Sequence, residues 1–463
     1  MSRVALVLLL AGVAAARPQP PAGFSHWSFD EITVSNGAKY QGLIQLEDSR
    51  WVQVQLVRRP PGKPTITLTT RFARQEIKAI RKLNDADRAV LKERIADLDP
   101  DGAGERRRME SLELTPVEWL GRAAAAKRYD SDYFSLVSGA SDEVTRRAAV
   151  RVEQIYTAFA RFLPPTVPDG RPTVVYLAPD PDEYRKLLGP LGQEQLLNPA
   201  VYDAQTNRIL CGSDLRRLGG QLQSALIHHS QELAALTKYE ADLRRLYKQP
   251  ELGQHLAVAA KERRKVNAAD RANGAQFDKS ASRLFAVLYH EAFHAYASTF
   301  AYPPLSPADV TAGKGAGALP RWLNEGLAQV FETAVVEAGE LRVDHADEDR
   351  LGRVKQRLKE SGSAGLVPLG DVLAVGKDAF LAHHAAERAA ADRAYLTSWA
   401  LAYYLTLDRR VIGTEKFKEY LVSVNSGGDA KAAFAALVGQ DLPAFEKDWH
   451  QFLGRLQPDG TQK

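Results

Sequence analysis

The sequence predicts an α+β protein in which a small all-β domain precedes a larger domain with a helical C-terminal part. Three observations predict it. Short strand-like segments fill about 27–80, strands and helices mix from about 133 onward, and the chain is helical nearly to its end after 375. A length of 463 residues exceeds what one ordinary core organises, so more than one domain is expected.

The composition is that of a soluble globular protein, with 45% apolar residues, 25% charged residues and a net charge of +4. Basic residues are mixed with acidic ones along the chain, as in "ERRRME" and "KERRKVNAAD", so no nucleic-acid interface is expected. The single cysteine, Cys211, leaves no internal disulfide. Stability therefore has to come from packed cores and any bound metal.

The first sixteen residues, "MSRVALVLLLAGVAAA", have the features of a secretory signal peptide. A basic start at Arg3 precedes an apolar run that ends in small residues, and the run is too short for a membrane span. We therefore expect a signal peptide over 1–16 and an exported, periplasmic or extracellular mature chain. No later segment reads as a membrane span.

Residues 17–82 are predicted to form a small β-barrel-like domain. The strand "EITV" leads into the turn pair Asn36-Gly37, and Val52 and Val54 alternate with polar residues in "WVQVQLV". This domain carries no recognisable chemistry. We expect it to dock an envelope partner or to shield the rest of the protein.

Residues 83–129 are predicted to be a helix and a linker, because the amphipathic segment "NDADRAVLKERIADL" is broken by "DPDGAG". The main domain is predicted over 130–457. It opens with a strand, a helix capped by Ser141, a second strand, a short helix and a β-hairpin. A helical hairpin over 215–265 follows and precedes a further helix.

That further helix carries "HEAFH", with His290 and His294 four residues apart. Residues at this spacing share one helix face, so the two imidazoles can bind one metal ion. Glu291 follows the first histidine, where its carboxylate can take a proton from a metal-bound water. H-E-x-x-H on a helix is the pattern of zinc hydrolases, in which three protein ligands and a water surround the ion.

The third ligand is predicted to be Glu325, in "LPRWLNEGLAQVFETA". Pro320 suits the first turn of a helix, and the loop before it lets the chain return antiparallel to the motif helix. Gly326 and Ala328 are small, so the second helix is expected to approach the motif helix closely. A glutamate within an apolar helical segment is typical of a buried ligand.

These residues carry a resemblance. "HEAFH…PRWLNEGLA" resembles the gluzincin group of metallopeptidases, and the layout over about 130–457 resembles the peptidase MA-like domains, with local similarity to the aminopeptidase N family at "WLNEG". The resemblance implies a zincin-like fold, Zn²⁺ held by His290, His294 and Glu325, and Glu291 as general base.

The same resemblance suggests Tyr395 as a donor to the oxyanion. In the aminopeptidase N family a tyrosine opens a helix at about this distance from the glutamate ligand, and Tyr395 opens "YLTSWALAYYLTLD" here. A purely structural aromatic remains an alternative, as do Tyr403 and Tyr404, and His345 or a backbone amide could serve instead.

Other candidates are weaker. The adjacent pairs His228-His229 and His383-His384 cannot converge on one metal if they lie on helices. Glu332, seven residues after Glu325, could hydrogen-bond a ligand histidine, and a plain surface glutamate is the equal alternative.

The sequence thus predicts an exported zinc metallopeptidase that hydrolyses peptide bonds in a peptide or protein substrate. Two alternatives stay open. One is a non-catalytic, zinc-containing peptide-binding or envelope scaffold protein, and the other is a hydrolase of non-peptide amides.

Overall fold

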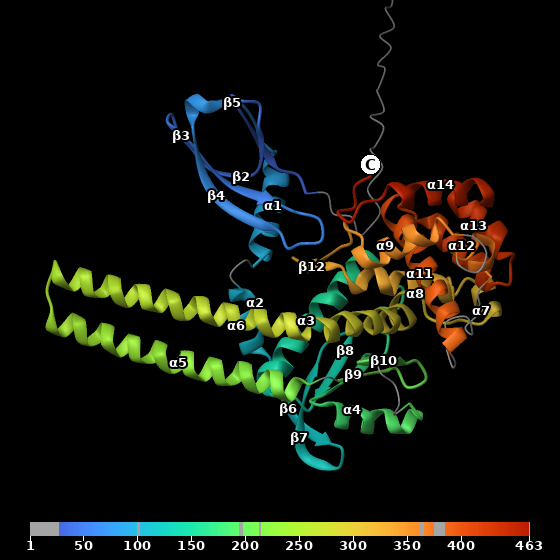
Figure 1. Ribbon diagram of the computed structural model, residues 1–463, viewed down its shortest axis with the longest axis horizontal. Coiled ribbons are helices and arrows are strands. Elements are labelled where there is room, and N and C mark those ends of the chain that lie inside the picture. The colour runs from blue at the N-terminus through green and yellow to red at the C-terminus, as the bar shows by residue number, and fades with distance from the viewer. Residues whose placement is uncertain are drawn as a thin grey trace, which may run out of the picture.

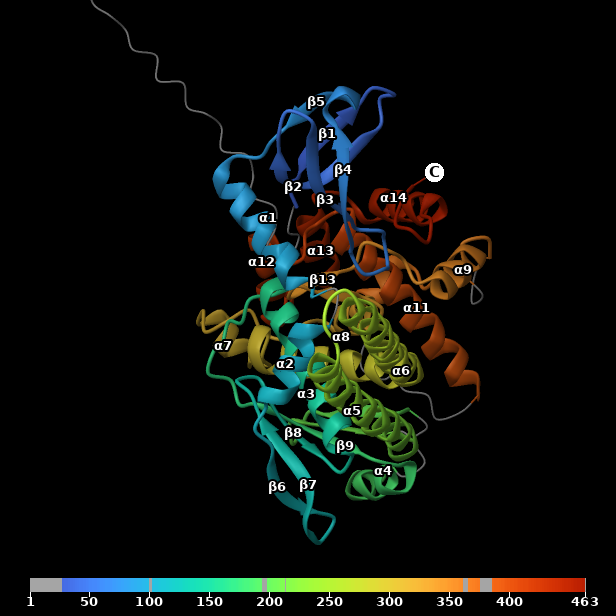
Figure 2. The same ribbon diagram turned by 90° about the vertical axis from the view of Figure 1, so that its left-hand side faces the viewer.

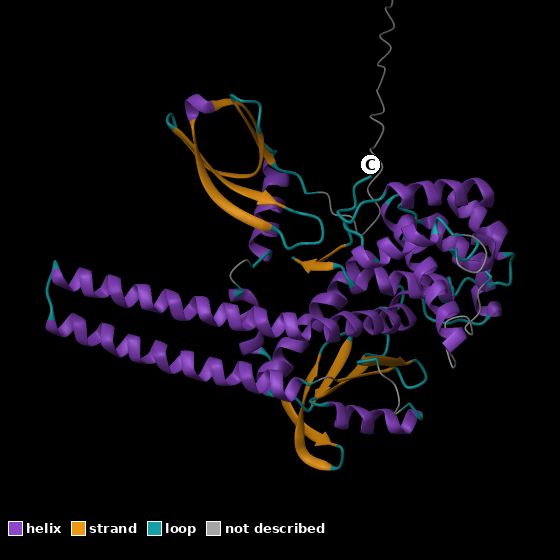
Figure 3. Cartoon of the chain, viewed as in Figure 1, coloured by secondary structure: helices purple, strands orange, loops and turns teal. Residues whose placement is uncertain are grey.

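The computed structural model describes residues 27–99, 102–193, 198–212, 214–360, 365–374 and 385–462. An all-β region comes first, a second sheet with helices follows, and the C-terminal part is helical (Figures 1 and 3). This confirms the predicted α+β class, with an all-β region at the N-terminal end and a helical part at the C-terminal end. The predicted signal peptide and the His383-His384 pair lie outside the described residues. Within them, no helix combines the length and the apolar character needed to cross a bilayer.

The N-terminal region is a strongly curved antiparallel sheet of order β4-β3-β2-β1-β5 (Figure 1). Alternation places Val52 and Val54 inside, and both are almost fully buried, as their pattern predicts. Helix α1 begins after the N-cap Asn84 and packs Leu91 and Ile95 against one end of the sheet. The bounds are β1 Asp30–Val34, β2 Lys39–Glu47, β3 Trp51–Arg58, β4 Ile66–Ala73, β5 Ile77–Arg81 and α1 Asp85–Asp97.

The predicted linker over 83–129 needs correction, because it contains two strands. After α2 (Ala103–Ser111), strands β6 (Thr115–Trp119) and β7 (Arg122–Asp130) form a hairpin whose turn has Leu120 and Gly121 at positive φ. The alanine run in β7 favours a helix locally. Antiparallel pairing with the next strand overrides that preference, so the second sheet begins well before residue 130.

The second sheet has six strands in the order β10-β11-β9-β8-β7-β6. Its central strands β8, β9 and β11 are parallel, and β10 is an antiparallel edge strand. Helix α3 and the end of α6 cover one face and α4 covers the other, so both faces of the central strands are largely buried, whereas β6 and β7 are mostly exposed. The bounds are β8 Phe134–Ser138, α3 Asp142–Phe162, β9 Thr173–Ala178, α4 Pro181–Leu188, β10 Ala200–Asp203 and β11 Arg208–Gly212.

Helices α5 (Leu215–Leu246) and α6 (Glu251–Tyr296) form a long antiparallel hairpin that projects from the body of the molecule (Figure 1). A helical hairpin was predicted over 215–265 as a unit separate from the motif helix. In the structure its second arm and the motif helix are one continuous helix of 46 residues. The candidate metal ligands therefore lie on the same rigid element as the projecting arm.

The adjacent histidines of α5 point to different partners. His228 Nε2 lies 3.4 Å from a carboxylate oxygen of Glu232 on the same helix. His229 contacts Asp270 across the hairpin through Nδ1. They do not converge, as expected of neighbours on a helix.

The rest of the described chain forms the helical C-terminal part. After the short α7, helix α8 returns across the end of α6, and a short β-hairpin follows α8. The bounds are α7 Pro307–Thr311, α8 Arg321–Glu332, β12 Val335–Glu337, β13 Glu340–Arg342, α9 Glu348–Arg357, α10 Leu369–Val372, α11 Ala385–Leu407, α12 Glu415–Asn425, α13 Ala430–Val438 and α14 Leu442–Arg455.

The N-terminal sheet and the six-stranded sheet lie toward opposite ends of the molecule, with helices between them (Figure 2). Charged contacts hold the N-terminal sheet against the β12–β13 hairpin. Arg59 Nη2 lies 3.0 Å from Glu340, whose carboxylate also accepts a hydrogen bond from Trp27. Arg342 donates to the Lys63 carbonyl at 3.0 Å. The small β region is thus tied to the segment that directly follows α8.

Candidate metal centre

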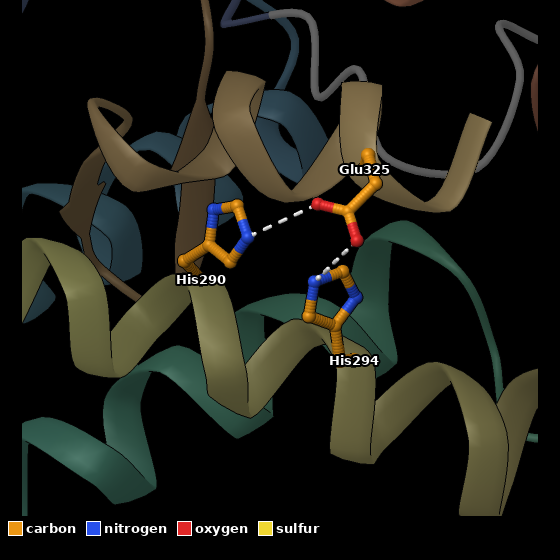
Figure 4. A group of neighbouring side chains, drawn as sticks. All are labelled: His290, His294 and Glu325. Atoms are coloured by element: carbon orange, nitrogen blue, oxygen red, sulfur yellow. Dashed lines mark ion pairs between the residues drawn. The ribbon is translucent and has the colours of Figure 1, made fainter. Parts of the chain in front are cut away.

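Helices α6 and α8 bring three side chains to one point. His290 and His294 lie one turn apart on α6, and Glu325 reaches them from α8 (Figure 4). The nearest ligand atoms are 3.5 Å apart for His290 Nε2 and Glu325 Oε2, and 3.6 Å apart for His294 Nε2 and Glu325 Oε1. One ligand atom from each residue lies within 4.8 Å of the others.

These distances suit a metal ion. Bonds of about 2.0–2.1 Å in a tetrahedral site leave neighbouring ligand atoms roughly 3.3 Å apart. The two shortest glutamate–histidine distances are slightly longer and end on different carboxylate oxygens, and one atom from each residue lies within 4.8 Å of the others, so side-chain movement would bring the three to bonding distance. The three residues predicted as ligands therefore form a group that could hold a metal ion.

Packing on the far side of α6 fixes this arrangement. Phe293 lies between the two histidines in sequence and is fully buried. Its ring centroid is 4.8 Å from that of Phe331 on α8 and 5.5 Å from that of Phe159 on α3. Aromatic pairs at these distances stabilise packing, so Phe293 helps to hold α6 against α8 on the side of α6 opposite the histidines.

The helix α8 also approaches α11 very closely, and this corrects one prediction. A Cβ atom added to Gly326 would lie 2.3 Å from the Ser398 carbonyl oxygen and 2.7 Å from the Ala402 Cβ. The glycine therefore permits contact with α11 rather than with the motif helix, as the sequence had suggested. Gln329 also joins α8 to α11, because its side-chain amide donates a hydrogen bond of 3.0 Å to the Tyr395 carbonyl.

Glu325 is only 2% exposed, so its charge needs compensation. Burial raises its pKa, but the neighbouring histidines and Arg321 outweigh burial and hold the pKa well below its usual range. Arg321 lies one turn before Glu325 on α8, and its Nη2 is 2.7 Å from Glu325 Oε1. The carboxylate is thus ionised, as a metal ligand must be.

Burial lowers the pKa of His290, but the carboxylates of Glu325 and Glu332 outweigh it and raise that pKa to about 10. Glu332 Oε2 lies 3.7 Å from His290 Nδ1, which is an ion-pair distance rather than a hydrogen bond. Arg350 of α9 holds Glu332 at 2.6 Å and donates to the Gln329 carbonyl. Glu332 thus lies beside the candidate ligand His290, but the hydrogen bond that the sequence suggested between them is not formed.

Glu291 does not belong to the ligand group and faces a pocket of about 540 Å³ beside it. Its Oε2 accepts a hydrogen bond of 2.8 Å from the backbone amide of Tyr202, on the edge strand β10. The predicted base thus lies next to the ligands, with its carboxylate held from the sheet side of the pocket.

Tyr395 lines the same pocket from α11. Burial and the charge of Glu325 raise its pKa to about 12, and Arg321 opposes the rise. The hydroxyl therefore stays protonated at neutral pH. Of the alternatives, Tyr403 and Tyr404 are buried in the core, and His345 lies against Gly62 of the N-terminal region.

Sequence reasoning missed several residues of the pocket. Arg321 could have been predicted, because it lies four residues before Glu325 on the same helix, the spacing of an intrahelical ion pair. Tyr202 and Arg350 gave no such signal, because they arrive from β10 and α9.

The site lies within a segment that matches a known family. Residues 286–424 match the family described as "Protein of unknown function (DUF1570)". This segment contains the three candidate ligands, Glu291 and Tyr395, and it leaves the N-terminal sheet and most of the helical hairpin outside. The search of curated proteins and the search of solved structures gave no significant match.

Proposed function

We propose that this chain is an exported zinc-dependent metallopeptidase with a zincin-like fold over its main domain. The observation that carries the proposal is the grouping of His290, His294 and Glu325 beside a pocket into which Glu291 projects. Export rests on the signal-like residues 1–16.

Zinc is the ion that this donor set favours. Two imidazole nitrogens and one carboxylate oxygen form a common ligand set of catalytic zinc, which keeps a further position open. When bound, such an ion activates water and polarises a carbonyl group. A site built only for structure would more often be closed by a fourth protein ligand.

The residues of the chain supply the remaining functions. Glu291 would accept a proton from the water that attacks the carbonyl carbon and return it to the leaving amine nitrogen as the C–N bond breaks, and the Tyr202 amide orients its carboxylate. Tyr395 donates its hydroxyl hydrogen to the developing oxyanion, because its raised pKa keeps that hydrogen in place. Arg321 and the two neighbouring histidines keep the Glu325 carboxylate in its ionised form, against the effect of burial.

A peptide is the favoured substrate because an edge strand borders the pocket. Val201 and Tyr202 of β10 line it, and β10 is hydrogen-bonded to β11 on its other side. An extended peptide can pair with such an edge through its backbone at positions other than the Tyr202 amide, which donates to Glu291. This favours peptide bonds over isolated amides.

The test is Glu291→Gln, which keeps the shape of the side chain and removes the proton acceptor. We expect zinc content to stay and hydrolysis of casein or short peptides to fall by roughly two or more orders of magnitude. Glu419→Gln, at an exposed glutamate of α12, is the matched control and should leave both unchanged.

Unchanged activity in Glu291→Gln would place the base elsewhere, and loss of zinc would make Glu291 a ligand. A wild-type protein that holds zinc and binds peptides without turnover would favour the non-catalytic scaffold. Selective hydrolysis of cell-wall amides would instead favour a non-peptide amidase.

A further inference from the structure

The far end of the helical hairpin exposes two apolar side chains. Leu246, the last residue of α5, is 76% exposed, the largest value among the bulky apolar residues that the structure describes. Tyr247 follows it and is 37% exposed, with its ring centroid 4.5 Å from that of His255 on α6. This end of the hairpin stands clear of the body of the molecule (Figure 1). Leu246 and Tyr247 therefore form an apolar tip.

The same end of the hairpin carries a surplus of positive charge. Residues 237–265 contain eight Lys or Arg residues against four Asp or Glu residues, a surplus of four positive charges. The whole chain also has a net charge of +4, so the rest of the chain is balanced. The surplus is thus concentrated on the outer part of the hairpin.

Ion pairs within the hairpin do not remove this surplus. Three of the four acidic side chains each bind one cation: Glu240 binds Arg263, Asp242 binds Arg245 and Glu262 binds Lys265. The other five cations are exposed and form no ion pair with an acidic side chain of the described chain: Lys238, Arg244, Lys248, Lys261 and Arg264. Glu251 alone remains to oppose them, so this end attracts an anionic partner.

We propose that the tip of the hairpin binds the surface of an anionic lipid bilayer. Residues 244–248, "RRLYK", combine three cations with an aliphatic and an aromatic side chain. The cations suit lipid phosphates, leucine suits the boundary between headgroups and acyl chains, and tyrosine suits the same boundary because its ring is apolar and its hydroxyl polar. An acidic polymer such as a nucleic acid would match the charge but offer Leu246 no apolar contact, so lipid is the favoured partner.

Helix α6 connects this tip to the candidate metal centre. From Glu251 to His290 the helix is roughly 60 Å long, at about 1.5 Å per residue. A membrane-bound tip would therefore hold the centre up to that distance from the lipid surface. Under the proposed peptidase function, the substrates within reach would be proteins that extend this far from the bilayer. Lipid binding itself does not depend on that function.

The test is co-sedimentation of the mature chain, residues 17–463, with vesicles, so that the apolar leader cannot itself bind lipid. Vesicles of phosphatidylcholine and phosphatidylglycerol in equal parts are anionic, and vesicles of phosphatidylcholine alone are the neutral comparison. At about 0.1 M salt we expect binding to be about tenfold or more tighter to the anionic vesicles, and to weaken as added salt screens the charges.

Two variants separate the apolar and the charged contributions. Leu246→Ser should weaken binding to the anionic vesicles by roughly tenfold, because a polar side chain does not enter the lipid. The double variant Arg244→Gln with Lys248→Gln should weaken it by roughly thirtyfold, since each cation near an anionic surface contributes about fivefold. Circular dichroism should show unchanged helix content in both, because the three side chains are exposed.

Matched controls lie nearer the base of the same hairpin. Ile227→Ser replaces an apolar side chain that is 51% exposed, and Lys279→Gln with Arg283→Gln removes two exposed cations. Both should bind like the unaltered mature chain, because these positions lie far from the tip.

A fluorescent probe locates the contact directly. The only cysteine, Cys211, is fully buried, so Leu246→Cys and Ile227→Cys can each be labelled alone with an environment-sensitive fluorophore. Anionic vesicles should shift the emission to shorter wavelengths at position 246 and leave it unchanged at position 227.

The proposal is overturned if the anionic vesicles are not bound, if neutral vesicles bind equally well, or if the control variants lose as much affinity as the tip variants. It is also overturned if the fluorophore responds at neither position or equally at both. Loss of binding in the cation variant alone would indicate an acidic polymer in place of lipid, and loss in Leu246→Ser alone would remove the role of charge. None of these measurements needs hydrolysis, so failure here is distinct from failure of the peptidase proposal.

Discussion

Gly326→Ala tests whether the contact between α8 and α11 sets the position of Glu325. The added methyl group would lie 2.3 Å from the Ser398 carbonyl oxygen, about 1 Å short of the 3.4 Å at which ordinary contact begins. The obstacle is backbone, which cannot rotate away as a flexible side chain can. We therefore expect α8 to move away from α11 and to take Glu325 with it.

The magnitude follows from two opposing effects. Overpacking a core of this kind costs about 1–3 kcal/mol, and two close contacts place this site at the upper end. Replacing a helical glycine with alanine regains about 1 kcal/mol. The net loss of about 2 kcal/mol should lower Tm by roughly 3 °C, because a domain of about 330 residues unfolds with an entropy of about 0.7 kcal/mol/K near Tm.

The zinc affinity should fall as well, because metal–ligand distances tolerate a change of only about ±0.2 Å. The assays are thermal unfolding and competition for zinc with a chromophoric chelator. Gly352→Ala on α9 is the matched control, since no atom lies within 4 Å of its added methyl group, and we expect it to be neutral or slightly stabilising. A Gly326→Ala protein with wild-type Tm and zinc affinity would refute the role given to this contact.

Three further predictions concern the site. His294→Ala should reduce zinc from about one ion per chain to none by elemental analysis, and full occupancy in that variant would remove His294 from the ligand set. Tyr395→Phe should lower kcat by about 10²-fold with zinc and folding unchanged, whereas wild-type turnover would leave the oxyanion to a backbone amide. Because the pKa of metal-free His290 is about 10, a proton competes with the metal below that pH, so zinc affinity should rise roughly tenfold per pH unit between about pH 6 and pH 8. Competition titrations at several pH values measure the slope, and a flat profile would contradict this protonation state.

The sequence could predict features that depend only on neighbouring residues within one helix or strand. The alternation at Val52 and Val54 predicts a half-buried strand, and both side chains are buried. The four-residue spacing of His290 and His294 predicts one helix face, and the two rings do meet Glu325 there. Ser141 predicts a helix start, and its side chain accepts a hydrogen bond from the Val144 amide.

The remaining features depend on contacts between segments that are distant in the sequence. Strand β7 reads as a helix former, and only pairing with β8 makes it a strand. Gly326 reads as a small residue on a helix, and only the position of α11 shows what it permits. The amide of Tyr202 and the guanidinium of Arg350 reach the site from β10 and α9. Helix periodicity links residues three or four apart, so the sequence could place the two candidate histidine ligands on one helix face. How separate elements meet depends on the packing of the whole core, so the sequence could not predict the residues that surround these candidate ligands.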